Sequence, residues 1–90
     1  VAAAGPVMEP NFPNPFNPVT TLRFSVPRDG RVTVSIFDVR GRRVDTLLDE
    51  EMDAGTRDLT WHAARHASGI YYAQLRTATD SQTKAMVLVR

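Results

Sequence analysis

The sequence contains no cysteine in its 90 residues. Disulfide bonds and thiol chemistry are therefore excluded, although the lack of cysteine does not identify a compartment. Long hydrophobic runs are missing as well, since none approaches the ~20 apolar residues that a membrane-spanning helix needs. An excess of charge of either sign is also missing, because the chain has 11 Lys and Arg and 10 Asp and Glu, which gives a formal net charge of +1. That balance argues against strong attraction to nucleic acids or membranes.

Signatures of catalysis and of metal binding are missing too. His62 and His66 are the only histidines, we expect both in an exposed loop, and no nucleophile elbow or triad motif accompanies them. Their spacing suits two metal ligands on a helix, but no motif places a third ligand, so two solvated histidines are favoured. The acids at 49–53 do not follow calcium-loop spacing and are interpreted as solvated. We therefore expect no catalytic residue, no metal and no cofactor.

The chain is long enough for one small domain. Ninety residues with a hydrophobic content of 42% provide one core, near the lower size limit for independent folding. Residues 1–10 are interpreted as a linker from a preceding domain, because they begin with a small, flexible stretch that has no initiator Met. The folded domain is expected over residues 11–90.

The segment 11–18, named the strap from here on, has an unusual composition of three Asn, three Pro and two Phe. Each Pro fixes its own φ, removes a backbone donor and biases the preceding residue toward extended conformations. The pattern predicts a stiff, extended strap in which Phe12 and Phe16 both grip a core. A plain linker is the alternative, but a strand pattern begins at once at Val19, which favours a lid on the domain.

Alternation of apolar and polar residues predicts short β-strands along the rest of the chain. The first two, 20–26 and 31–38, are interpreted as a hairpin closed by the turn 27–30. A second turn, 38–42, opens with Asp38 and places Gly41 in a left-handed conformation. Further strands are expected at 43–48 (with a bulge), 57–61, 69–75 and 83–89, and an acidic loop at 49–55. The last strand has apolar residues on both faces and is expected to be buried or flanked.

Six to seven short strands with regular turn signals, and no sustained helical period, are typical of an all-β, antiparallel sandwich, with a barrel as the lesser alternative. Trp61 is expected to plug the core. The expected inward-facing residues are Leu22, Phe24, Val34, Ile36, Leu59, Trp61, Tyr71, Leu75, Met86 and Leu88.

Several motifs together resemble a known family. The strap NFPNPFNP followed by TTLRF resembles the opening of C-terminal type A sorting domains of the type IX secretion system. The similarity continues through VTVSIFD (32–38), GRRV (41–44), AG (54–55), TW (60–61), ASGIY (67–71) and KAMVLVR (84–90). The immunoglobulin-like domain of flagellar hook-capping proteins has a closely similar pattern. The short segment between Trp61 and Gly69, which lacks the acids and glycines found there in many relatives, is more usual in sorting domains.

The resemblance implies an immunoglobulin-like sandwich of about seven strands that acts as a non-catalytic sorting and surface-anchoring domain of a larger secreted protein. Its implied partners are the outer-membrane type IX translocon, a sortase-like peptidase and an upstream catalytic or adhesive domain, often a hydrolase. The implied location is extracellular or on the outer-membrane surface of a Gram-negative bacterium.

The family motifs also imply three groups of site residues. The segment read by the translocon is expected to include Lys84, Met86, Val87, Leu88, Val89 and Arg90. The strap motif contributes Asn14, Pro15, Phe16, Asn17 and Pro18. The turn contributes Gly41 and Arg42.

Two other functions stay open at this point. A carbohydrate-binding module of a secreted glycoside hydrolase would need an exposed row of aromatic rings, drawn from Phe37, Trp61, Tyr71 and Tyr72. Alternation, however, places Tyr71 and Tyr72 on opposite faces. A structural spacer or assembly module is the third possibility, supported by the hook-capping resemblance.

Overall fold

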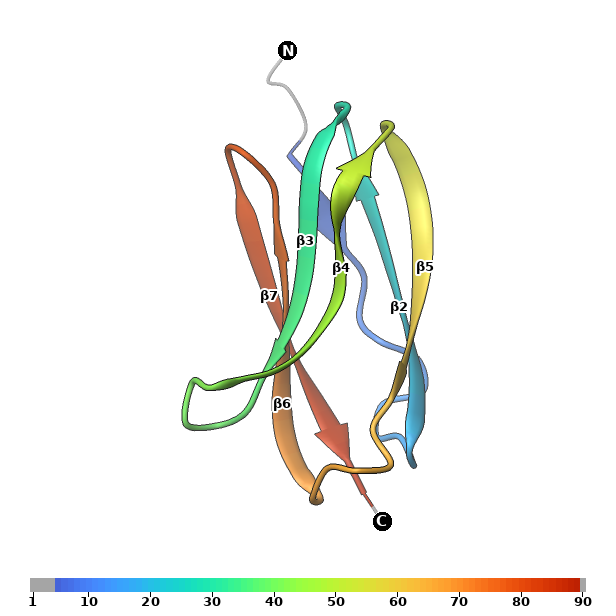
Figure 1. Cartoon of the computed structure of the whole chain (residues 1–90). Coiled ribbons are helices and arrows are strands. Elements are labelled where there is room, and N and C mark those ends of the chain that lie inside the picture. The colour runs from blue at the N-terminus through green and yellow to red at the C-terminus, as the bar shows by residue number, and fades with distance from the viewer. Residues whose placement is uncertain (1–4, 90) are drawn as a thin grey trace.

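The computed structural model describes residues 5–89. Over this range the chain forms seven strands and no helix, in two antiparallel sheets packed face to face (Figure 1). The strands are β1 (Val7–Met8), β2 (Val19–Val26), β3 (Gly30–Phe37), β4 (Arg43–Met52), β5 (Gly55–His62), β6 (Gly69–Arg76) and β7 (Ser81–Leu88). One sheet has the order β1-β2-β5 and the other β4-β3-β6-β7. The predicted antiparallel, immunoglobulin-like β-sandwich is confirmed.

The predicted hairpin of the first two long strands is wrong. β2 pairs with β5 along its whole length, whereas β3 pairs with β4 and β6 in the opposite sheet. Both strands have one apolar face, and these faces meet across the core because that buries both. The β2–β3 and β4–β5 connections cross between the sheets at the same end, where Asp29 Oδ1 accepts a hydrogen bond from the Ala54 N–H at 2.7 Å.

The predicted acidic loop is also mostly wrong, because β4 continues through Asp49–Met52 and only Asp53 and Ala54 form the turn. β4 is an edge strand, so its acids reach solvent without leaving the sheet. Ion pairs offset some of their repulsion, with Arg31–Asp49 at 2.8 Å and Arg57–Glu50 at 3.1 Å. Register shifts in the β3–β4 pairing confirm the predicted bulge.

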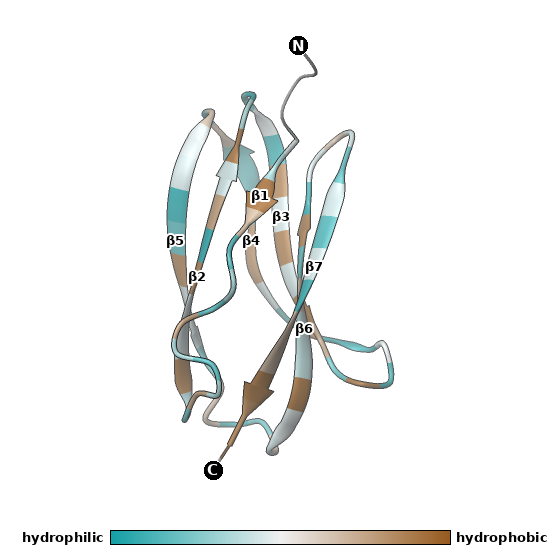
Figure 2. Cartoon of the chain, turned by 180° about the vertical axis from the view of Figure 1, so that it is seen from behind, coloured by the Kyte–Doolittle hydropathy of each residue, from teal (hydrophilic) through white to brown (hydrophobic). Residues whose placement is uncertain are grey.

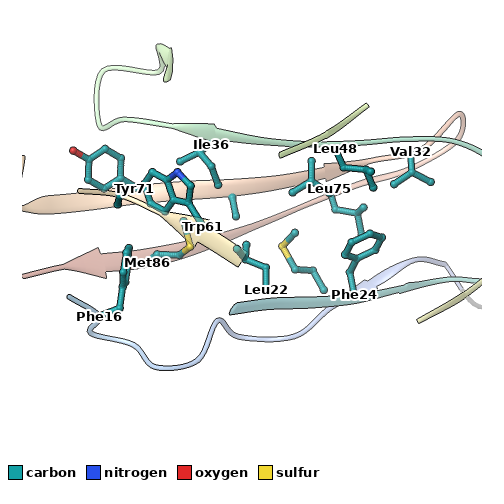
Figure 3. Close-up of a cluster of buried hydrophobic side chains, with 14 of the residues drawn as sticks. Phe16, Leu22, Phe24, Val32, Ile36, Leu48, Trp61, Tyr71, Leu75 and Met86 are labelled. Atoms are coloured by element: carbon teal, nitrogen blue, oxygen red, sulfur yellow. The ribbon is translucent and has the colours of Figure 1, made fainter. Parts of the chain in front are cut away.

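The core contains the predicted inward-facing residues, with Leu59 half-buried against it. Trp61 is 1% exposed, and Figure 3 shows it at one end of the core, near Phe16, Tyr71 and Met86. Its indole Nε1–H donates to Asp45 Oδ2 at 3.0 Å, which satisfies the one polar group of the ring.

β1 lies inside the segment 1–10 that is interpreted as a linker. It pairs with β2 through Val7 and Met8, and Met8 is 2% exposed in the core. The end of that segment is therefore part of the sandwich, while residues 1–4 lie outside the described range. The division into residues 1–10 and 11–90 stays a prediction.

β7 is an edge strand that pairs only with β6 within its sheet. Its inward residues Met86 and Leu88 are fully buried, but Val87 is 36% and Val89 is 46% exposed. The expectation that this strand is buried or flanked by neighbours is confirmed, because β6 pairs with it on one side and Phe16 is bridged to Leu88 on the other, while Val87 and Val89 on its outer face stay exposed.

Candidate recognition surface at the strap and the last strand

The strap packs along the edge of the sandwich, as predicted for a lid, but it is not uniformly extended. It bends at 13–15 and 17–18, and its three Xaa-Pro peptide bonds are cis. Its first contact is a pair of main-chain hydrogen bonds, from Phe12 N–H to Thr21 O (3.0 Å) and from Thr21 N–H to Phe12 O (2.9 Å). These bonds fix the start of the strap on β2.

A buried polar cluster, not anticipated from the sequence, holds the strap's first turn. Asn11 is 5% and Thr20 is 1% exposed. The Asn11 side-chain amide donates to Pro13 O (3.2 Å) and to Thr20 Oγ1 (3.0 Å), and the Thr20 hydroxyl donates to the same Pro13 carbonyl at 2.9 Å. The sequence signal that could have indicated this cluster is an Asn close to prolines, because an Asn side chain can form the hydrogen bonds that the proline backbone cannot.

The middle of the strap is joined to the end of β7. Phe16 N–H donates to Val87 O at 3.0 Å, and Val89 N–H donates to Phe16 O at 2.9 Å. Asn14 Oδ1 accepts the Val87 N–H at 3.0 Å. The strap thus occupies the outward backbone groups of β7 at Val87 and Val89, which an edge strand would otherwise leave open.

Phe16 anchors this arrangement in the core. Its side chain is 1% exposed, and its ring centroid lies 5.7 Å from that of Trp61 (Figure 3). The prediction that Phe16 grips the core is thus confirmed.

Phe12 does not grip the core, contrary to expectation, and is 79% exposed. It is paired with Thr21 in an antiparallel bridge, and opposed residues of such a bridge share a face. Thr21 alternates with the buried Thr20 and Leu22, so the bridge turns Phe12 toward the outer face of the β1-β2-β5 sheet. Composition alone predicts the same burial for both Phe residues, whereas the main-chain pairing of Phe12 with Thr21 leaves Phe12 exposed.

Among the residues expected to be read by the translocon, the fold separates two groups. Met86 and Leu88 are core residues with exposures of 0% and 1%. Lys84, Val87 and Val89 are exposed, and Arg90 lies outside the described residues. A folded domain therefore presents only the second group to a partner.

The predicted turn forms, with Gly41 at φ 82°. The Asp38 carboxylate closes it by accepting from the N–H groups of Arg40 (2.9 Å) and Arg42 (3.0 Å) and from the Arg42 Nε at 3.1 Å. The backbone N–H of Arg42, followed by that of Arg40 and the Arg42 side chain, lowers the pKa of the Asp38 carboxyl. The loop projects away from the sandwich (Figure 1), so the strap and β7 are brought together but Gly41 and Arg42 are not.

The two histidines differ from expectation. His62 is exposed but is the last residue of β5. His66 is half-buried, with its ring centroid 5.4 Å from Trp61 and 5.8 Å from Tyr71, because the chain folds back over the Trp61 end of the core. Over residues 5–89 there is no group of three or more His, Asp or Glu side chains arranged to hold a metal ion. Nor does any helix in that range have the length and apolarity to cross a membrane.

A family model described as a secretion system C-terminal sorting domain matches residues 11–89, which run from the strap to the end of β7. No curated protein matches the chain. Domains of this matched family are non-catalytic, which agrees with the prediction that the chain is not an enzyme. The match implies that the chain is part of a secreted or cell-surface protein that interacts with the type IX secretion system. The suspected resemblance is confirmed, and the chain belongs to the secretion system C-terminal sorting domain family.

Proposed function

We propose that this domain directs a larger secreted protein through the outer-membrane type IX translocon of a Gram-negative bacterium, and that the strap and β7 form the recognition region. The observation that carries this proposal is the set of three hydrogen bonds that link Asn14 and Phe16 with Val87 and Val89. They join the first and last motifs of the sequence into one region. Folding thus brings separate stretches together, and recognition of the folded domain uses both.

The exposed and the buried residues of this region have different roles. Lys84, Val87 and Val89 are available for contact, whereas Met86, Leu88 and Phe16 keep the strand and strap in place from inside the core. Residues 11–90 act as the sorting domain, and residues 1–10, whose end joins the sandwich through Val7 and Met8, connect it to the upstream part of the secreted protein, called the passenger from here on. In this scheme the passenger is a hydrolase, peptidase or adhesin. A sortase-like peptidase then removes the domain and anchors the passenger at the cell surface.

The test is fractionation of a type IX-competent host that exports a reporter carrying this chain at its C-terminus. Deletion of residues 84–90 is the simplest variant, but it removes two core side chains and is expected to unfold the domain. A triple variant, Lys84→Glu/Val87→Glu/Val89→Glu, keeps Met86 and Leu88. Periplasmic retention of a triple variant that melts like the parent supports the proposal, and normal export overturns it.

The competing proposal of a carbohydrate-binding accessory module has one observation in its favour, the exposed ring of Phe12. A row of rings is what a sugar-binding face needs, and Trp61 and Tyr71 are buried instead. Depletion of the chain by insoluble polysaccharides, lost in Phe12→Ala, would favour this module. A structural spacer predicts export of the triple variant at the parent level.

A further inference from the structure

The outer face of β6 and β7 has an apolar patch that no other element covers within residues 5–89. Tyr71, Ala73, Met86 and Leu88 point into the core, so their strand neighbours point outward. In the register of the two strands Ile70 pairs with Val87 and Tyr72 pairs with Ala85. The β6–β7 patch consists of Ile70, Tyr72, Ala85, Val87 and Val89.

This patch is apolar, exposed and uncharged. Ile70 is 44%, Val87 is 36% and Val89 is 46% exposed, and Tyr72 is half-buried. Figure 2 shows hydrophobic colouring on the last part of β7 and on the adjoining part of β6. Phe37 on β3 pairs with Tyr72 and extends the row, also half-buried. A contiguous group of exposed apolar residues suits a protein-interaction surface better than a solvated face.

The four ion pairs of the described residues lie away from the patch, and the nearest charged side chains on the same face are Arg43, opposite Phe37, and Arg76, farther along β6. Ion pairs join Arg23 to Asp58 on the other sheet, Arg31 to Asp49 and Arg57 to Glu50 toward the opposite end, and Arg42 to Asp38 in the projecting turn. An uncharged patch does not suit a nucleic acid or an anionic lipid surface, which basic residues recognise. It suits the apolar contact surface of another protein.

The strap decides whether a partner uses the edge or the face of β7. Addition of a partner strand requires free backbone groups at the sheet edge. At Val87 and Val89 those groups are already bonded to Asn14 and Phe16. A partner that meets the end of β7 therefore meets side chains on the outer face, where Ile70 and Tyr72 of β6 lie beside Val87 and Ala85.

We propose that the type IX component that receives this domain docks on the β6–β7 patch through an uncharged apolar surface, so that Ile70 and Tyr72 are part of the recognition site together with Val87 and Val89. The inference rests on the proposed function and adds residues outside the terminal segment. Two features support this partner: the patch is continuous with that segment, and the family match implies contact with the secretion machinery. A linear terminal signal would not involve Ile70, which precedes Val87 by 17 positions.

The test measures export of the reporter fusion described above for Ile70→Glu, Ile70→Thr, Val87→Glu and the triple variant. Ile70→Thr keeps a β-branched side chain, so it provides a second test at this position if Ile70→Glu fails to fold. Val19→Glu is the matched control, because Val19 is 37% exposed on β2 in the other sheet and Val87 is 36% exposed. Thermal melting of each chain checks the fold.

Loss of one apolar anchor at the centre of an interface is expected to lower the exported fraction about tenfold or more. The proposal predicts this fall for both Ile70 variants and for Val87→Glu, with melting unchanged and Val19→Glu exported like the parent. Parent-level export of the Ile70 variants, with the triple variant retained, overturns the patch and leaves the proposed function standing. Retention of a folded Val19→Glu also overturns it. Export of the triple variant overturns the proposed function and the patch together.

Discussion

Asn14 and Val87 lie 73 positions apart in the sequence, and the Val87 N–H donates to Asn14 Oδ1 at 3.0 Å. This bond and the two main-chain bonds of Phe16 give β7 a hydrogen-bonded partner along the edge that faces away from β6. The strap therefore pairs with the edge of the sheet at Val87 and Val89, within the last segment that the family motifs include.

Replacement of Asn14 by Ala removes the acceptor of the Val87 N–H. We expect a loss of about 0.5–1.5 kcal/mol in the free energy of unfolding, the range for a single hydrogen bond. We also expect faster hydrogen exchange at the Val87 amide. Asn14→Asp keeps an acceptor oxygen at the same place and is the control. Equal protection of Val87 in the parent and in Asn14→Ala would show that the bond does not hold the strand.

Phe16 and Phe12 provide a matched pair within the strap. Phe16→Ala removes a ring that is 1% exposed and is expected to cost about 3–5 kcal/mol. Phe12→Ala removes a ring that is 79% exposed and is expected to change stability by at most about 0.5 kcal/mol. Urea unfolding of the two variants measures both values. Similar losses for the two would contradict the described packing of the strap.

Trp61→Ala is expected to destabilise the domain by about 3–5 kcal/mol, because the ring is 1% exposed. Trp61→Phe keeps most of the apolar contact but leaves Asp45 without its indole partner, so a smaller loss is expected. Thermal melting distinguishes the two variants. Parent-like melting of Trp61→Ala would place the centre of the core elsewhere.

Acid is expected to destabilise the domain through Asp38 and Asp58. The pKa of Asp38 is lowered mainly by the Arg42 N–H, and the pKa of Asp58 is lowered mainly by its hydrogen bond from Arg23. Each group therefore contributes stability above the unfolded-state aspartate pKa of about 3.9, and this contribution is lost as the pH falls through the lower folded-state value. Urea midpoints should hold from pH 7 to about 5 and decline below about 4. Asp38→Asn and Asp58→Asn should each reduce that decline, and an unchanged slope in both would contradict the assignment.

Local pattern predicted the strands well because burial of one face imposes alternation on each strand separately. The Tyr71–Ala73–Leu75 face and the burial of Trp61 follow from this rule, and both are observed. The partner of each strand does not follow from it. β2 and β3 have the pattern of a hairpin, yet they lie in different sheets, because apolar faces can meet across a core as well as side by side.

The candidate site was predicted in part. Motif similarity singled out the strap and Lys84–Arg90, and the fold places the strap against the end of β7. Ile70 and Tyr72 were not anticipated as residues that contact the translocon (Tyr72 was considered only for a sugar-binding row), because only the β6–β7 register sets them beside Val87 and Ala85. The burial of Met86 and Leu88 similarly separates core residues from contact residues in a segment that the motif treats as one unit.

The most direct test of the sorting role is the exported fraction of a reporter that carries Lys84→Glu/Val87→Glu/Val89→Glu, measured beside the parent in a type IX-competent host. These three residues are exposed on or beside β7, while Met86 and Leu88 stay in the core, so melting should stay close to that of the parent. The reporter is expected to accumulate in the periplasm. A folded variant that reaches the medium or the cell surface at the parent level would contradict it.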